Sequence, residues 1–146
     1  MLKIFLRAFF TLYSWVIPKT WMPPYIRLPS VYKKALIRPE GTWPYESPTI
    51  QVIVELEIPE GAERYQGSYK RYELKCRADM AYVKSITYFD GTGVPDTEVV
   101  TSFMDNEFRY IKGSVVYPKY GFSDSYYGAC ASGIHFFMTR KQAERY

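Results

Sequence analysis

The chain has 146 residues, of which 47% are hydrophobic, and carries a formal net charge of +4. This length allows one domain with its own core and excludes a two-domain dehydrogenase or a barrel enzyme. The apolar content excludes a disordered chain. Two Cys residues argue against a disulfide scaffold, and a single His argues against a His-based metal site.

The positive charge is concentrated at the N-terminal end. Residues 1–39 contain seven Lys and Arg and no Asp or Glu, whereas residues 40–146 contain twelve basic and all fifteen acidic residues, a net charge of −3. A body of net negative charge is a poor general binder of polyanions, so we do not expect nucleic acid as its partner. Only the basic end has the charge to contact nucleic acid, anionic lipid or an acidic protein surface.

Residues 1–17, MLKIFLRAFFTLYSWVI, have apolar side chains at helical spacing before Pro18, which predicts an amphipathic helix. The uncharged run is too short for a membrane span of about 20 residues, and Pro-Lys-Thr-Trp after it does not fit a signal-peptide cleavage site. A basic, acid-free, aromatic helix suits a membrane surface, a groove on a partner or a retained mitochondrial leader. The alternative is a helix packed on its own domain. The side chains that we expect to dock this helix are Phe5, Arg7, Phe9, Leu12 and Trp15.

Residues 18–48 contain seven of the ten prolines, with Trp and Tyr between them. Because proline keeps a chain extended, we expect a stiff arm that lies across a surface with aromatic anchors, or else a loop wrapped around its own domain. Its candidate docking residues are Trp21, Tyr25 and Arg27. A short helix is expected at residues 30–37. We therefore divide the chain into a leader and arm, 1–48, and a globular domain, 49–146, which we expect to fold without them.

The residues after the arm predict a mainly antiparallel β domain with a short C-terminal helix, of the α+β class. In residues 49–58 apolar side chains alternate with polar ones, which is typical of a half-buried strand. Thr139 and Gln142 fit a capping box that begins the helix. Other strands are expected at 71–77, 81–89, 97–102, 108–111, 114–117 and 134–138, with loops at 60–69 and 118–129.

Short motifs in residues 50–146 resemble a known uncharacterised domain. They are a strand ending in Ile58-Pro59, the run Lys75-Cys76-Arg77-Ala78, the segment 108–113, and Gly133-Ile134-His135-Phe136-Phe137 before the terminal helix. That domain occurs C-terminal to pentapeptide repeats in many bacterial and viral proteins and in some eukaryotic ones. This sequence has the basic leader in place of such repeats. The resemblance implies a shared fold and brings no known activity with it.

Cys76, Cys130 and His135 are the only thiol and imidazole groups. A Cys–His nucleophile needs both groups within hydrogen-bond reach and a third group that orients the base, and zinc needs four ligands, so this set matches neither pattern. We expect both Cys to be small buried hydrophobes, although an oxidising compartment would allow a disulfide between them. Glu55 and Glu57 are interpreted as the solvated face of a strand. The sequence thus predicts no enzyme, no metal and no cofactor.

Two regions mix aromatic with basic side chains, one around Tyr69 and Arg71 and the other around Tyr120. Aromatic stacking next to a cation holds nucleotides, and the same chemistry anchors protein interfaces, which we favour for a net acidic body. Together with His135, these residues form the candidate pocket for a small ligand.

Two functions from different classes follow. In the first, the chain is a non-enzymatic accessory or structural subunit that docks through its leader and arm on protein subunits of a larger membrane-associated complex. The basic leader favours a mitochondrion, with peripheral placement on the inner membrane and a respiratory or ATP synthase complex as host. In the second, the chain is a stand-alone binding protein for a small anionic ligand such as a nucleotide.

Overall fold

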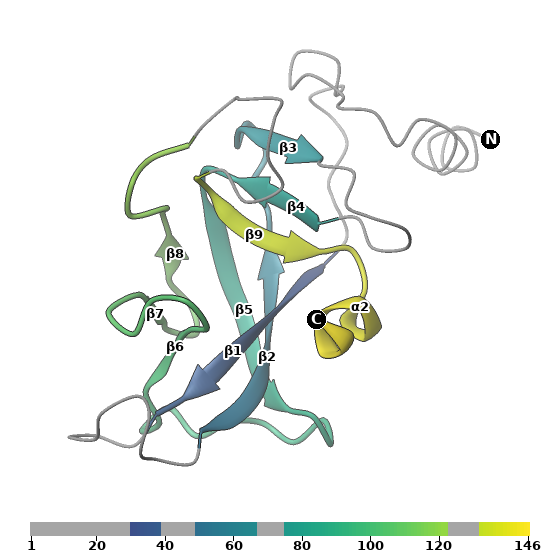
Figure 1. The fold of residues 1–146 in the computed structure, drawn as a ribbon, viewed down its shortest axis with the longest axis vertical. Coiled ribbons are helices and arrows are strands. Elements are labelled where there is room, and N and C mark those ends of the chain that lie inside the picture. The colour runs from purple at the N-terminus through teal and green to yellow at the C-terminus, as the bar shows by residue number, and fades with distance from the viewer. Residues whose placement is uncertain (1–29, 39–48, 67–74, 123–131) are drawn as a thin grey trace.

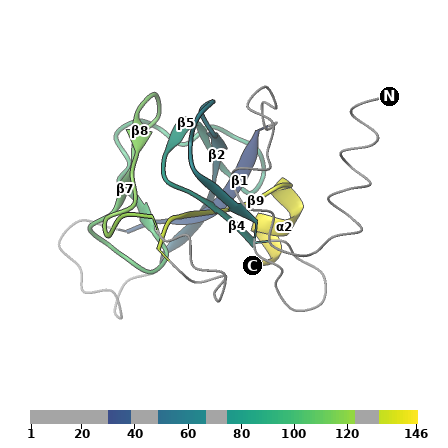
Figure 2. The same cartoon turned by 90° about the horizontal axis from the view of Figure 1, so that it is seen from above.

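The computed structural model describes residues 30–38, 49–66, 75–122 and 132–146. In this part of the chain, nine strands form one antiparallel sheet that curls around an apolar core, and a short helix lies against its outer side (Figures 1 and 2). The predicted combination of antiparallel strands and a terminal helix is confirmed. The elements are β1 (Val31–Ile37), β2 (Ile50–Glu57), β3 (Arg64–Gln66), β4 (Lys75–Ala78), β5 (Ala81–Tyr88), β6 (Val100–Ser102), β7 (Arg109–Tyr110), β8 (Val115–Val116), β9 (Ile134–Phe137) and α2 (Arg140–Arg145).

The main path of the sheet runs in the order β3-β4-β9-β1-β2-β5-β8. β6 pairs with β1 outside this path, and β7 pairs with β6. The register of β2 against β5 shifts between Glu55 and Leu56, which marks a bulge. Because a bulge bends its strand and increases the local twist, it helps the sheet to curl rather than lie flat.

β1 lies in the middle of the sheet, where the sequence predicted a short helix, so that prediction is wrong. Leu, Lys and Ala favour a helix in isolation, but here the backbone pairs with β2 over the whole length of the strand. Val31, Ala35 and Ile37 are buried in the core. The sheet therefore begins before the predicted boundary at residue 49, and residues 49–146 alone lack a central strand.

The other strands follow the sequence more closely. β2, β5 and β9 lie within one or two residues of their predicted bounds, whereas β6, β7 and β8 are shorter than expected. β3 occupies part of the predicted loop at 60–69, which corrects that prediction. Its three residues lack an alternating apolar pattern, and they are a strand because they pair with β4.

Apolar side chains pack on both sides of the sheet. The main core fills the inside of the curl and includes Val52, Val54, Leu56, Val83, Ile134 and Phe136. A smaller cluster on the outer side joins Ile53 and Phe137 to Ala143 of α2, with Tyr32 packed against it. α2 is thus held in part by burial of Ala143, its one apolar residue.

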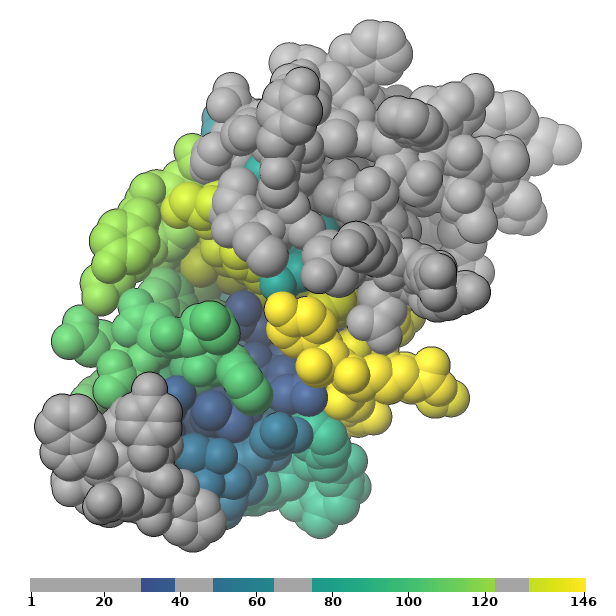
Figure 3. All heavy atoms as spheres, in the orientation of Figure 1, coloured from purple at the N-terminus to yellow at the C-terminus, as the bar shows by residue number. Residues whose placement is uncertain are grey.

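The start of α2 forms as the sequence predicted. The Thr139 side chain accepts from the backbone N–H of Gln142, and the Gln142 side chain accepts from the backbone N–H of Thr139, which completes the capping box. Arg140 then fixes the helix to β5 by donating to the Thr87 hydroxyl at 2.7 Å and to the Tyr88 carbonyl at 2.8 Å. In the space-filling view, α2 and the β6–β7 region lie on the same face of the molecule, on either side of β1 (Figure 3).

The predicted leader helix and most of the proline arm lie outside the described residues. The same is true of the candidate docking residues Phe5, Arg7, Phe9, Leu12, Trp15, Trp21, Tyr25 and Arg27. In the described ranges, no helix has the length and apolar character needed to cross a membrane.

Candidate functional site

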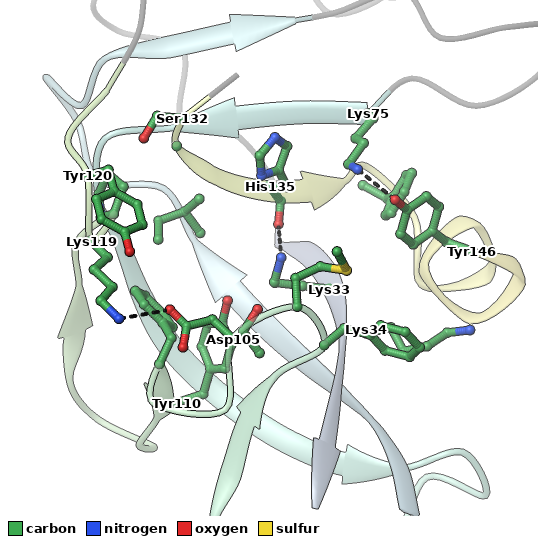
Figure 4. A pocket seen from close by; sticks show the side chains of 18 residues that line it. Lys33, Lys34, Lys75, Asp105, Tyr110, Lys119, Tyr120, Ser132, His135 and Tyr146 are labelled. Carbon is green, nitrogen blue, oxygen red and sulfur yellow. Dashed lines mark hydrogen bonds and ion pairs between the residues drawn. The ribbon is translucent and has the colours of Figure 1, made fainter. Parts of the chain in front are cut away.

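The sheet opens beside β1 because this strand has two different partners along one edge. Tyr32 pairs with Phe137 of β9, whereas Ala35 begins the ladder with β6. Lys33 and Lys34 lie between the two ladders, where β9 and β6 separate (Figure 4). A cavity of about 600 Å³ occupies this fork. Its polar lining comprises Lys33, Lys34, Lys75, Ser102, Asp105, Tyr110, Lys119, Tyr120, Ser132, His135 and Tyr146.

Lys33 stands on the inner face of the sheet. Successive side chains of a strand point to opposite faces, so Lys33 shares its face with Val31 and Ala35, both 0% exposed. Its register partner on β2 is Val54, which is also fully buried. A lysine in such a row is unusual, because lysine is rarely placed among fully buried neighbours. The stem of Lys33 therefore starts in the core, and the half-buried side chain reaches the cavity.

The amine of Lys33 is held at the gap between the strands. Its Nζ donates to the backbone carbonyl of His135 at 3.2 Å, as Figure 4 shows. Burial, with a smaller contribution from the positive charge of Lys75, lowers the pKa of Lys33 to about 8. This amine therefore loses its proton far more readily than an ordinary lysine. Figure 4 shows the neighbouring Lys34 amine directed away from Lys33.

Lys75 enters the cavity from β4, on the far side of β9. Its Nζ donates to the hydroxyl of Tyr146 at 2.7 Å and lies 4.5 Å from the centre of the Tyr146 ring. The Tyr146 ring packs against Phe137 with centroids 5.1 Å apart. The end of the chain after α2 thus positions this second amine.

Lys119 lies at the opposite side of the cavity and is paired with carboxylates. Its Nζ is 3.0 Å from Glu107 and 3.4 Å from Asp105. These two hydrogen bonds raise the pKa of Lys119. The backbone N–H of Glu107, followed by Lys119 itself, lowers the pKa of Asp105. Lys119 is therefore neutralised locally, unlike Lys33 and Lys75.

The wall behind His135 contains a buried guanidinium. His135 is half-buried on β9, and its register partner is Arg77 of β4, whose side chain is 0% exposed. Arg77 donates from Nη1 to the carbonyl of Ser132 at 2.9 Å. Gly133 permits this packing, since it has a φ of +157° and a Cβ there would lie 3.0 Å from the Cβ of Arg77. Arg77 is thus fixed on β4 next to His135, a residue that lines the cavity.

Aromatic side chains line the cavity from its base to its mouth. Tyr110 is buried at the base, where burial raises the pKa of its phenol, and its ring lies 5.2 Å from that of Phe108. Tyr120, 82% exposed, and Phe103, 46% exposed, lie at the mouth. The cavity therefore combines amines with flat apolar surfaces.

The structure brings two of the four predicted pocket residues together. Tyr120 and His135 both line this cavity, whereas Tyr69 and Arg71 lie outside the described residues. Cys76 is buried in the core, and burial raises its pKa to about 12. Cys130 is outside the described residues, so its expected role as a small buried hydrophobe stays a prediction, with a disulfide to Cys76 as the alternative.

The remaining sequence candidates serve the sheet. Glu55 accepts from the Ser85 hydroxyl at 2.8 Å and lies 3.6 Å from the Lys84 amine across the β2–β5 ladder. Neither Glu55 nor Glu57 lines the cavity. In the described ranges, His, Cys, Asp and Glu form no group of three or more that could hold a metal ion.

Sequence reasoning found one of the four lysines of the cavity, Lys119, as the cation in the aromatic and basic region around Tyr120. Lys33 carried a signal, because a strand through VYKKALI would place it between Val31 and Ala35 on an apolar face, but the segment was interpreted as a helix. Lys75 carried none, since the pairing of β4 with β9 brings it to the cavity from a distant part of the chain.

The fold and the cavity define a domain built from one curled antiparallel sheet with a basic, aromatic cavity at a fork between its strands. The chain belongs to a family of unknown function, DUF5758, whose pattern matches residues 22–143. This match includes β1, which the resemblance over residues 50–146 left out.

Among curated sequences, the chain is similar to "Uncharacterized protein L223" of Acanthamoeba polyphaga mimivirus. The two are 38% identical over 98 residues, which is 64% of this chain and 61% of the viral protein. No solved structure matches the chain.

Proposed function

We propose that the protein binds a small anionic ligand with a flat ring, such as a nucleotide, in the cavity beside β1. The observation that carries this proposal is the charge of the lining among the described residues, which has four lysines and one carboxylate, that of Asp105. The volume of about 600 Å³ is within the range of roughly 300–1,000 Å³ that is typical of small-molecule sites.

Lys33 and Lys75 are the amines best placed to meet an anion. Lys33 donates to a backbone carbonyl and Lys75 to a phenol, so the partners of these two bonds carry no negative charge. Lys119, by contrast, is already paired with Asp105 and Glu107. A phosphate or carboxylate between Lys33 and Lys75 would gain charge-assisted hydrogen bonds, which are stronger than neutral ones.

The exposed aromatic side chains at the mouth suit a ring. Tyr120 and Phe103 both line the cavity with exposed aromatic side chains. Stacking on such side chains contributes about 1–3 kcal/mol per base in proteins that bind single nucleic-acid strands, and it tolerates any base. The amines thus select for charge, and the rings select for a planar group.

The accessory-subunit hypothesis remains a second proposal, and it depends on the leader and arm. Its docking residues, its mitochondrial placement and its membrane-associated host complex are predictions about residues outside the described part of the chain. Co-purification of the full chain with its native partners tests it. The relation of residues 50–146 to the domain that follows pentapeptide repeats is likewise a proposal from the shared motifs.

Thermal unfolding of the full chain with a panel of ligands tests the anion site. AMP and ATP should raise the unfolding temperature, inorganic phosphate less, and uncharged adenosine least. A ligand at a hundred times its Kd stabilises the folded state by about 2.7 kcal/mol, which is a shift of several degrees.

Matched variants assign the effect to the cavity. Lys75→Gln should reduce the shift, whereas Lys112→Gln, at an exposed position away from the cavity lining, should leave it unchanged. No shift with any nucleotide, or an equal loss in both variants, would contradict the proposal.

A further inference from the structure

The position of Lys33 suits a reaction of its amine as a nucleophile as well as recognition of an anion. Its stem rises between the fully buried Val31 and Ala35, and its amine ends in the cavity 3.2 Å from the His135 carbonyl. Lys75 contributes a second amine from the neighbouring side of β9, as Figure 4 shows. A lysine that is withdrawn from water next to another cation is the arrangement that activates an amine as a nucleophile.

We propose that Lys33 attaches covalently, as an imine, to a ligand that carries both an aldehyde or ketone and a carboxylate or phosphate. This inference rests on the proposed anion site, because Lys75 would hold the anionic group while Lys33 meets the carbonyl carbon. Lys34 on the same strand does not share this position, since Figure 4 shows its amine directed away from Lys33.

The reaction needs the neutral form of the amine. With a pKa of about 8, Lys33 is neutral in about 10% of molecules at pH 7, compared with roughly 0.03% for a lysine at the ordinary value near 10.5. A less basic amine is also a weaker nucleophile, which offsets part of this gain. We expect Lys33 to react on the order of ten times faster than an exposed lysine.

The step is balanced without an oxidant or reductant. The lone pair of Lys33 Nζ forms a bond to the carbonyl carbon, and the electron pair of the C=O bond moves to oxygen, which takes a proton from water. The nitrogen returns a proton to water, which gives a neutral carbinolamine. Its hydroxyl takes a second proton from water, the nitrogen lone pair forms the second C–N bond as the C–O bond breaks, and the oxygen leaves as water. The nitrogen then returns its second proton to water. The product is a C=N bond between Lys33 and the ligand, plus one water molecule.

The pH dependence of this step is set by the groups around Lys33. Among the described residues, the titratable groups that line the cavity with it are Lys34 on β1, Lys75 on β4, Tyr110 on β7, His135 on β9, Asp105, Lys119 and Tyr120 on loops, and Tyr146 after α2. Lys75 lowers the pKa of Lys33, and its effect is secondary to burial. Loss of the Lys75 charge should therefore move the reaction to higher pH.

Reductive trapping on the full chain tests the inference. The probe is pyridoxal 5′-phosphate, which has an aldehyde, a ring and a phosphate; borohydride converts its imines to stable secondary amines that peptide mass mapping locates. Lys33 should be labelled first, with a midpoint near pH 8, and on the order of ten times faster than Lys112. Pyridoxal without the phosphate should label Lys33 more slowly, and AMP should slow the labelling by the phosphate form.

Variants separate the imine from simple anion binding. Lys33→Arg keeps the positive charge but has no amine that can form an imine, so it should lose the adduct. Lys75→Gln should raise the midpoint of labelling, and Lys75→Arg should preserve it. Labelling spread over exposed lysines with Lys33 not ahead would overturn the imine. If AMP still raises the unfolding temperature in that case, only the covalent step is refuted. If AMP does not raise it, the anion site is refuted as well.

Discussion

The substitution Lys33→Met should make the folded protein more stable at neutral pH while weakening its anion site. Lysine 33 occupies a row of buried aliphatic side chains on β1, so methionine offers an uncharged chain of similar length in the same place. Residues kept for function commonly reduce stability, and their replacement recovers it. Lys34→Met, on the other face of the strand, is the matched control and should change stability by less than about 0.5 kcal/mol.

The expected gain follows from the pKa of Lys33. Its pKa is about 8 in the folded chain and near 10.5 in the unfolded chain, so the unfolded state binds more protons between these pH values. Below pH 8 the buried charge of Lys33 therefore lowers the free energy of unfolding of the wild type by its full penalty. This free energy recovers as the pH rises toward 10.5. At roughly 1.4 kcal/mol per pH unit, this penalty is up to about 3 kcal/mol.

Loss of the hydrogen bond to the His135 carbonyl offsets about 1 kcal/mol of the gain, which leaves roughly 2 kcal/mol at pH 7. For a chain of this length, that is a rise of several degrees in the unfolding temperature.

Chemical denaturation of the wild type and Lys33→Met between pH 6 and 10 measures this effect. Cys76 and Tyr110 have pKa values raised by burial, so they reduce stability as the pH rises above their unfolded values, in both proteins equally. The difference between the two proteins therefore isolates Lys33. It should be about 2 kcal/mol in favour of the variant at pH 7 and should shrink above pH 8. A difference independent of pH, or a less stable variant, would refute the reasoning.

The remaining predictions concern the framework around the cavity. Deletion of residues 1–48 removes β1 and should abolish cooperative thermal unfolding. Deletion of residues 1–29 keeps every described strand and should preserve cooperative unfolding. A 1–48 deletion that still folds would show that β1 is dispensable. Gly133→Ala should lower the free energy of unfolding, measured by denaturant titration, by about 1–3 kcal/mol, because the φ is +157° and the new Cβ would lie 3.0 Å from the Cβ of Arg77 on β4. Gly93→Ala, with open space around its Cβ, should have no comparable effect. Thr139→Ala should reduce stability by about 0.5–2 kcal/mol through loss of the cap of α2, and an unchanged unfolding midpoint would argue against the cap.

Local sequence patterns were sufficient for some elements of this fold and insufficient for others. Alternation of Val52, Val54 and Leu56 located β2, and the Thr139–Gln142 pair located the start of α2, because each pattern reflects contacts close in the sequence. β1 was misread because its Lys, Ala and Leu residues favour a helix, and its strand geometry depends on β2, β6 and β9. β3 depends in the same way on β4.

The candidate site was harder to predict from the sequence for the same reason. His135 and Tyr120 could be named from their chemistry, but nothing local places them at the fork that β9 and β6 form along β1. The amines of Lys33 and Lys75 come to one cavity through strands that are more than forty residues apart along the chain. The burial of Arg77, the register partner of His135, is likewise a product of packing between β4, β9 and the turn at Gly133.

The most direct test of the anion site is to map where a nucleotide binds in solution. Backbone amide NMR spectra of the full chain, recorded while AMP is added, should show saturable shifts concentrated at Lys33, Lys75, Ser102, Lys119 and His135, with adenosine producing weaker shifts at the same positions. Spectra that do not change, or shifts confined to residues away from the fork, would contradict the account.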